Sequence, residues 1–220
     1  MTTPFEALRA IASQKVQLGA ALEHHEVFTM GGLLTLLWHG AGDEEEVVVC
    51  AGGAMGGLLG PADGLYHDLG VALADRGIAT VRVGWRRPND LDECLMDVLA
   101  VLQLASARGA SRAVTIGHSF GGAVAVQAGV VAADMVAGVV TLSTQSAGCE
   151  MADQLERRPV LCFHGDADEL LPPMCSELVA GLSGGELVVF PGAGHLLTQA
   201  HDELRMRLLD WIPKTLAPAP

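Results

Sequence analysis

Six short, mostly apolar runs alternate with helix-like segments along most of this chain, and this alternation strongly constrains its fold. The runs occupy residues 47–50, 79–83, 113–117, 138–142, 160–163 and 187–190. Continuous apolar strands of this length are typical of a parallel sheet that is covered on both faces. The helical patterns between them span residues 65–76, 91–108, 122–131, 173–182 and 201–216. The alternation predicts one doubly wound α/β domain, with a mostly parallel twisted sheet and helices on both faces.

The residues before the first run predict a different local structure. Thr3-Pro4-Phe5-Glu6 is typical of a helix start, because Thr can cap the helix, Pro suits its first turn and Glu completes a capping box. We expect this helix to reach about Leu18, within an N-terminal helical extension over residues 1–25 that covers an apolar patch rather than mediating dimerisation. Residues 26–30 and 33–38, joined at Gly31-Gly32, predict an antiparallel hairpin. The main domain then spans residues 26–213, and residues 214–220 are expected to form a frayed tail.

Charge and hydrophobicity exclude several classes of partner. The formal net charge is −13, whereas binding to nucleic acid or to an anionic membrane requires basic patches. The most apolar region, residues 121–142, is interrupted by Gln127 and Asp134, which argues against a transmembrane span. No signal peptide pattern opens the sequence. We therefore expect a cytoplasmic protein, a monomer or a homodimer, that binds neither nucleic acid nor membrane.

Cysteine and histidine spacing predicts neither disulfides nor a metal site. The five cysteines are odd in number, widely spaced and without a C-x-x-C motif. Cys50 and Cys162 lie in apolar runs and are predicted core residues. Four histidines away from the motifs below show no metal-ligand spacing and are expected on the surface or in loops; they are His24, His25, His39 and His67. The sequence thus predicts no metal and no other cofactor.

Residues 114–122, VTIGHSFGG, join one apolar run directly to a helical pattern through the motif G-x-S-x-G. In such a turn Ser119 would project from the end of a strand, while Gly117 and Gly121 leave space where a Cβ would collide. The helix that follows would direct its free N–H groups toward whatever Ser119 attacks. With 27 glycines in the chain, the pentapeptide alone is weak evidence, and a buried serine in a Gly-rich turn is the simpler alternative.

Other strand ends supply what a nucleophilic serine needs. Ligands of open parallel sheets bind at the carboxyl ends of the strands. The run at 160–163 is followed by a segment that contains Asp168, and the run at 187–190 by a loop that ends in His195. His195 can take the Ser119 proton near neutral pH, and a carboxylate such as Asp168 can orient the imidazole and stabilise its cation. The residues therefore predict acyl transfer through Ser119, Asp168 and His195.

An oxyanion hole is predicted from backbone groups. The Phe120 amide, directly after the nucleophile, would supply one N–H donor. The Gly-rich loop after the run at 47–50 would supply the other, with Gly53 the first candidate and Ala54 the alternative.

These motifs together resemble the α/β-hydrolase superfamily over about residues 26–213. The order Ser119, Asp168, His195 is that family's order. Residues 164–172 (HGDADELLP) resemble its acid segment, in which the last Asp of H-G-x-x-D completes the triad, so the resemblance selects Asp168 and not Asp166. Residues 191–195 (PGAGH) resemble its histidine loop. The family often has His-Gly at the start of the oxyanion loop, where this chain has Ala51-Gly52.

The resemblance also bears on the substrate. Many members insert a cap between the two strands that correspond to 138–142 and 160–163, but here only 17 residues separate these strands. We therefore expect no substantial cap domain, an open pocket and small or medium carboxylic ester substrates. Among lidless members the chain looks most like the dienelactone-hydrolase-like and carboxylesterase group. The better-known dienelactone enzymes have a Cys nucleophile, whereas this chain has Ser119.

Weaker candidates surround this prediction. Possible substrate-binding residues are Met55, Thr144, Gln145 and Arg86. For Met55 the alternative is ordinary packing, and for Arg86, with Arg87, it is a pair of exposed charges. His118 precedes the nucleophile and is given no chemical role. The alternative functions are a thioesterase or acyltransferase with the same triad, and a non-enzymatic small-molecule binder on the same fold.

Overall fold

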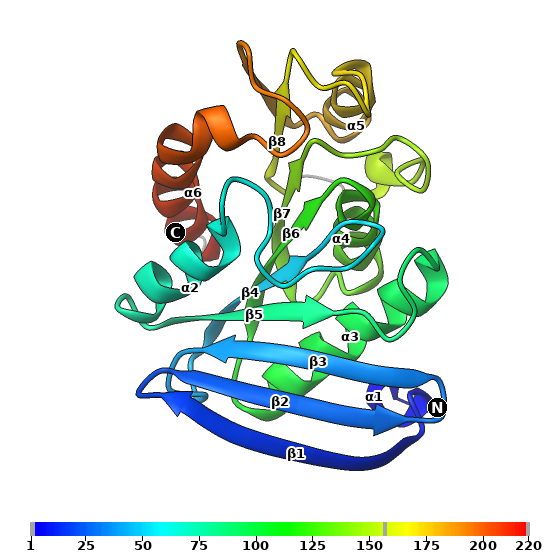
Figure 1. The fold of residues 1–220 in the computed structure, drawn as a ribbon, viewed down its shortest axis with the longest axis vertical. Coiled ribbons are helices and arrows are strands. Elements are labelled where there is room, and N and C mark those ends of the chain that lie inside the picture. The colour runs from blue at the N-terminus through cyan, green and yellow to red at the C-terminus, as the bar shows by residue number, and fades with distance from the viewer. Residues whose placement is uncertain (1–2, 156–157, 219–220) are drawn as a thin grey trace.

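A mostly parallel sheet of nine strands runs through the part of the chain that the computed structural model describes, residues 3–155 and 158–218 (Figure 1). From one edge to the other the strands are β1 (Ala10–Gly19), β2 (Leu22–Thr29), β3 (Gly32–His39), β5 (Ile78–Gly84), β4 (Glu46–Ala51), β6 (Arg112–His118), β7 (Val136–Leu142), β8 (Val160–Gly165) and β9 (Glu186–Phe190). The first three are antiparallel, and β3 meets β5 antiparallel. Strands β4 to β9 are parallel. The six apolar runs and the hairpin are thereby confirmed.

Helices cover both faces of the parallel part, as the apolar runs predicted. On one face lie α3 (Leu91–Ala107), α4 (Phe120–Val131) and α5 (Met174–Ser183), and on the other α2 (Leu65–Ala74) and α6 (His201–Leu216) (Figure 1). Strand β4 shows why both layers are needed: Val47 and Val49 face the first layer, while Val48 and Cys50 face the second. All four side chains are buried, because successive strand residues point to opposite faces.

The N-terminal segment contradicts the predicted long helix. Thr3 caps α1 (Pro4–Ala7) with the expected capping box, but the helix ends after one turn. Arg9 has a φ of +52°, and β1 begins at the next residue. Its apolar residues, Ile11, Val16 and Leu18, are not spaced as one helix face, and the free edge of β2 offers backbone hydrogen bonds instead. Residues 1–25 are therefore no helical extension, and in their described part they add a turn of helix and an edge strand to the sheet.

The short helix α1 does lie over an apolar surface. Leu8, just after it, is 2% exposed and belongs to the core beside α3. The Phe5 amide donates to the side-chain oxygen of Gln103 on α3 at 2.7 Å. By contrast, every residue of β1 is exposed. The covering role expected of the N-terminal segment thus falls to residues 4–8 and not to β1.

The C-terminal helix is longer than the predicted domain. Helix α6 continues to Leu216, whose side chain is fully buried. The Arg112 guanidinium donates to the carbonyls of Thr215 and Ala217 at 3.1 and 3.2 Å. A frayed tail from residue 214 is therefore wrong for residues 214–217, and residues 219–220 lie outside the described part.

Between β7 and β8 the chain makes only a short connection. In its described part this connection contains one 3₁₀ turn, Ala152–Leu155. No cap domain is built there, as expected. The carboxyl ends of the parallel strands are consequently left open.

Two of the four remaining histidines are not on the surface. His25 on β2 and His39 on β3 are 3% and 2% exposed, and burial lowers the pKa of each to about 4. The prediction failed for them because each hairpin strand has one buried face: His25 lies on that of β2, and His39 packs against Gly70 and His67 of α2. Cys50 and Cys162 are buried as predicted, and all five thiols are free. Within the described residues, no group of three or more His, Cys, Asp or Glu could hold a metal ion, and no helix could cross a bilayer.

Candidate active site

Ser119 lies at a strained turn between β6 and α4. Its backbone has φ +56° and ψ −119°, a region that side-chain-bearing residues rarely occupy. A Cβ on Gly117 would collide with the carbonyl oxygen of Gly121. A Cβ on Gly121 would in turn collide with the carbonyl oxygen of Gly52, in the loop after β4. The two glycines of the motif are therefore required by close backbone packing, which also joins the serine turn to that loop.

Asp168 and His195 are brought together from the ends of β8 and β9. His195 Nδ1 donates to Asp168 Oδ2 at 2.8 Å. The Asp168 side chain is fully buried and that of His195 is 12% exposed. Burial by itself raises the pKa of Asp168, but hydrogen bonds from the Leu171 amide, His195 and the Leu170 amide outweigh it and hold the pKa below its usual value. Asp168 is thus a carboxylate at neutral pH, and it sets the tautomer of His195.

Asp166 has a different part in the same region. Its Oδ1 accepts from the Gly192 amide at 2.6 Å. Asp166 therefore braces the turn that leads to His195, while Asp168 contacts the imidazole itself.

His118, to which the sequence assigned no role, contacts both the backbone and the ring of His195. Its Nε2 donates to the His195 carbonyl oxygen at 3.1 Å, and the two ring centroids are 4.9 Å apart. Burial lowers the pKa of His118 to about 4, so this ring is neutral. The available signal was its place at a strand end, beside the loop that carries His195.

The loop after β4 faces Ser119 with backbone alone. A Cβ on Gly53 would lie 3.9 Å from Ser119 Cβ, in ordinary van der Waals contact. The Gly53 carbonyl accepts from the Gly56 amide at 2.9 Å and from Trp85 Nε1 at 3.1 Å, and these two bonds hold the Gly53–Ala54 peptide. Phe120 is the first residue of α4, where backbone N–H groups have no partner within the helix.

Ser119 and His195 open on one pocket of about 490 Å³. Besides these two residues, its walls are His118, Leu196 and residues 52–60 of the loop. No Asp, Glu, Lys or Arg is among these lining residues. Met55, a predicted substrate contact, is on this wall and is 92% exposed.

Thr144 and Gln145 are not on the wall of this pocket. The Thr144 hydroxyl is buried and donates to the Gln145 carbonyl oxygen at 2.9 Å. The backbone N–H of Gln145 donates to the Ser119 carbonyl oxygen at 3.4 Å, and its side-chain Nε2 donates to the Ala147 carbonyl oxygen at 2.8 Å. Both residues therefore stabilise the serine turn through contacts to the Ser119 carbonyl oxygen, outside the pocket.

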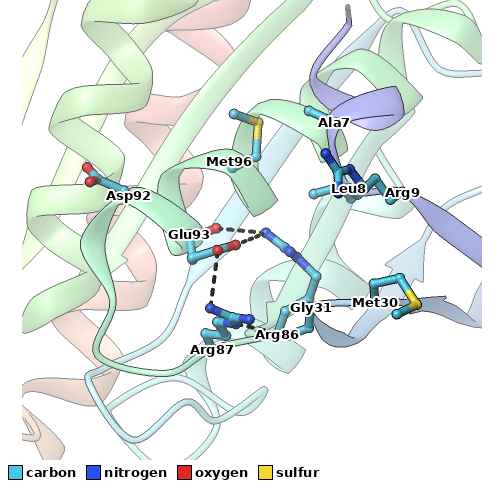
Figure 2. A pocket seen from close by; sticks show the side chains of 10 residues that line it. All are labelled: Ala7, Leu8, Arg9, Met30, Gly31, Arg86, Arg87, Asp92, Glu93 and Met96. Carbon is cyan, nitrogen blue, oxygen red and sulfur yellow. Dashed lines mark hydrogen bonds and ion pairs between the residues drawn. The ribbon is translucent and has the colours of Figure 1, made fainter.

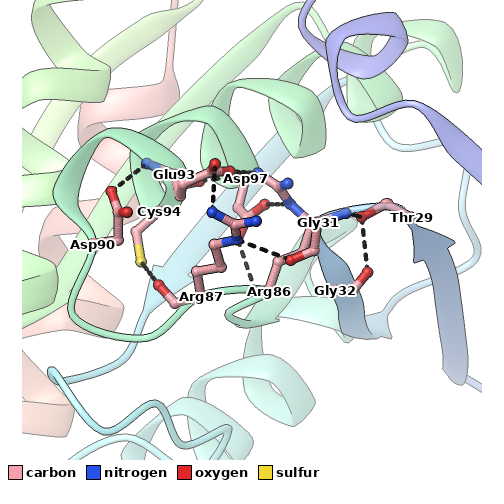
Figure 3. Close-up of polar contacts among 9 residues, drawn as sticks. All are labelled: Thr29, Gly31, Gly32, Arg86, Arg87, Asp90, Glu93, Cys94 and Asp97. Carbon is pink, nitrogen blue, oxygen red and sulfur yellow. Dashed lines mark hydrogen bonds and ion pairs between the residues drawn. The ribbon is translucent and has the colours of Figure 1, made fainter.

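Arg86 points into a different cavity, of about 440 Å³, between α1, the β2–β3 turn and α3 (Figure 2). Its side chain is 4% exposed. Its guanidinium donates to Glu93 Oε2 at 2.7 Å and to the buried carboxylate of Asp97 (Figure 3). Burial raises the pKa of Asp97 in spite of this pairing. Arg86 is therefore neither a substrate contact in the Ser119 pocket nor an exposed charge.

The exposed-charge alternative holds only for Arg87, whose side chain is 53% exposed. It donates to the Gly31 carbonyl oxygen at 3.1 Å (Figure 3). Glu93 and Asp97 are four residues apart on α3 and therefore share one helix face. Two acids on a helix face that is otherwise apolar were the signal for the Arg86 ion pair.

No protein-family model and no curated protein matches the sequence. Est1E from Butyrivibrio proteoclasticus matches the structure with a TM-score of 0.74 at 18% identity, over 89% of this chain and 99% of that one. A dienelactone hydrolase from Anabaena variabilis matches with a TM-score of 0.74 at 16% identity, over 93% and 99%. The protein has the α/β-hydrolase fold.

A third α/β-hydrolase-like structure, the thioesterase domain from the curacin biosynthetic pathway, matches with a TM-score of 0.68 at 14% identity. It covers 88% of this chain and 99% of its own length. The predicted fold without a substantial cap is thus confirmed. Because one fold hosts many chemistries, the activity has to be argued from the site.

Proposed function

We propose that this protein is a serine hydrolase that cleaves small or medium neutral carboxylic esters through an acyl-Ser119 intermediate. The observation that supports it most is the 2.8 Å hydrogen bond from His195 Nδ1 to the buried Asp168 carboxylate, in a pocket that His195 shares with the strained Ser119. With Nδ1 committed to Asp168, Nε2 is the nitrogen that can accept a proton.

The reaction follows from these groups. His195 Nε2 takes the Ser119 hydroxyl proton as Oγ attacks the ester carbonyl, and Asp168 stabilises the imidazolium that forms. The tetrahedral intermediate collapses when His195 returns the proton to the departing alkoxide, which leaves as the alcohol. Water then attacks the acyl-Ser119 ester with His195 again as base, releasing the carboxylic acid and regenerating the serine.

The negative oxygen of the intermediate needs two donors. We assign them to the amides of Phe120 and Gly53, with Ala54 as the alternative to Gly53. Gly53 is supported by its closeness to Ser119, since a Cβ at Gly53 would contact Ser119 Cβ. The bonds from Trp85 and Gly56 to the Gly53 carbonyl would hold the Gly53–Ala54 peptide, and with it the Ala54 amide, in place before the substrate arrives.

The pocket favours neutral substrates. Its lining residues carry no Asp, Glu, Lys or Arg, and its larger apolar members are Met55, Leu58, Leu59 and Leu196. A volume of about 490 Å³ and the absence of a cap in the described residues suit a short acyl group. A polyanionic leaving group such as coenzyme A would find no cation there and would meet a protein of net charge −13.

The direct test is labelling by a fluorophosphonate probe. We expect the native protein to be labelled and Ser119→Ala to be silent, with hydrolysis of p-nitrophenyl acetate and butyrate falling by at least about a thousandfold. The matched control is Ser111→Ala, an exposed serine away from the pocket, which should be labelled like the native protein. Native protein that resists the probe would overturn the proposal.

A substrate panel separates the remaining alternatives. Comparing short p-nitrophenyl esters with neutral thioesters and with acyl-coenzyme A distinguishes an esterase from a thioesterase or acyltransferase that uses the same triad. A non-enzymatic binder would bind a small ester saturably, would do so equally well as Ser119→Ala, and would release no burst of product.

A further inference from the structure

A second histidine, His164, contacts the same carboxylate as His195. It lies near the end of β8, and its side chain is fully buried. His164 Nε2 is 3.0 Å from the Leu171 carbonyl oxygen and 3.2 Å from Asp168 Oδ2. Because a carbonyl oxygen can only accept, Nε2 must carry a proton, which it donates to Leu171, and the same N–H edge of the ring lies against Asp168 Oδ2.

The other nitrogen of His164 is held by helix α5. Nδ1 is 2.7 Å from the hydroxyl of Ser176, which is itself completely buried. In the neutral ring Nδ1 is an acceptor, so the Ser176 hydroxyl donates to it. Ser176 therefore fixes both the tautomer and the orientation of His164.

The orientation of the Asp168 carboxylate is fixed by contacts to both of its oxygens. Its Oδ1 accepts from the Leu170 and Leu171 amides at 2.8 and 2.9 Å. Its Oδ2 accepts from His195 and also contacts His164 Nε2 at 3.2 Å. Three hydrogen bonds and this contact therefore surround the two oxygens of Asp168.

We propose that His164, oriented by Ser176, is a positioning residue that holds Asp168 Oδ2 against His195. The catalytic meaning of this contact rests on the proposed hydrolase function. His164 touches no reacting atom and acts only through Asp168. The resulting chain runs Ser176, His164, Asp168, His195.

The contact with His164 also affects how strongly Asp168 acts on His195. The partly positive N–H edge of His164 beside Oδ2 offsets some of the negative charge that would otherwise stabilise the His195 imidazolium. The other titratable ring beside these groups is His118, which is neutral, and α5 contributes only the Ser176 hydroxyl among the contacts to His164. Removing the His164 donor should therefore raise the proton affinity of His195.

The experiment compares three single variants and the double variant that combines His164→Leu with Ser176→Ala, by NMR titration of the His195 ring and by the pH profile of kcat/KM. His164→Leu removes the donor, and we expect the His195 titration and the acidic limb of the profile to move up by about half a pH unit, with kcat about tenfold lower. His164→Gln keeps an N–H donor near the place of Nε2 and should stay within about threefold of the native kcat. Ser176→Ala should shift both readouts in the same direction by less, and should add nothing to His164→Leu, because the two side chains act in series.

The titration needs no turnover, so the two proposals can fail separately. If the native protein neither reacts with the probe nor cleaves esters, while His164→Leu still moves the His195 titration, the hydrolase proposal fails and the positioning role stands. If an active His164→Leu keeps the native profile and titration, the positioning role is overturned and the hydrolase proposal stands. Should His164→Leu not fold, Ser176→Ala decides: a shifted His195 titration supports the role, and an unchanged one overturns it.

Discussion

At the scale of single residues, the site depends on glycines, which have no Cβ. Gly52, Gly117 and Gly121 bring three backbone segments so close that a Cβ on any of them would meet a carbonyl oxygen. This packing joins the serine turn to the loop that carries the proposed oxyanion donors. A methyl group at Gly121 should therefore disturb both at once.

We expect Gly121→Ala to lower the free energy of unfolding by about 3 kcal/mol and to abolish fluorophosphonate labelling. The matched control is Gly181→Ala in α5, where nothing lies within 4 Å of the added methyl. Because alanine favours helix over glycine, the control should be neutral or up to about 1 kcal/mol more stable. Urea unfolding measures both, and equal stability of the two variants would contradict the packing argument.

At the scale of elements, the N-terminal segment divides into a buried and an unburied part. Residues 4–8 pack on α3, and Leu8 is 2% exposed. Strand β1 pairs with β2 along one edge, while its own side chains stay exposed, among them Val16 at 53%. The free energy of unfolding should therefore depend on the packing of residues 4–8 and hardly at all on the side chains of β1.

Leu8→Ala should lower the free energy of unfolding by about 2–4 kcal/mol, because it leaves a cavity beside α3. Val16→Thr, which keeps the branched shape that strands favour, should stay within about 0.5 kcal/mol of the native value. Denaturant unfolding at two protein concentrations checks both. A cost for Val16→Thr that grows with protein concentration would mean that a second copy of the chain covers β1.

At the scale of the whole molecule, burial lowers the pKa of three histidines. They are His25, His39 and His118, and the pKa of each falls to about 4 from an ordinary value of 6.5. Between pH 4 and pH 6.5 these histidines therefore bind more protons in the unfolded chain than in the folded protein. Stability is complete above about pH 6.5 and falls as the pH drops toward 4.

Each of these histidines should contribute a loss of up to about 1.4 kcal/mol per pH unit in that window. Denaturant unfolding at about pH 7, 6 and 5 measures the slope, and His25→Gln and His39→Gln should each reduce it. A stability that stays constant over this range would show that these rings take up protons without unfolding.

The strand and helix pattern from residue 26 onward, the absence of a cap in the described residues and the residues proposed for the triad could be derived from the sequence alone. Each of these features depends on residues that are contiguous in the chain: an apolar run, a glycine-flanked serine, or the residues that follow a strand. The parallel sheet then places the ends of its strands at one edge, so that Ser119, Asp168 and His195 converge without further information.

Only the tertiary structure decided which groups meet across elements. Arg86 pairs with Asp97 because β5 and α3 pack together, and His164 reaches Asp168 and Ser176 because the end of β8, its following loop and α5 fold against one another. Residues 10–19 became a strand because the edge of β2 was free to pair, which their own pattern did not show. His25 is neutral because it lies on the buried face of its strand, and His39 is neutral because α2 packs against it. In each case the energy comes from contacts between residues distant in sequence, and those contacts exist only once the elements have assembled.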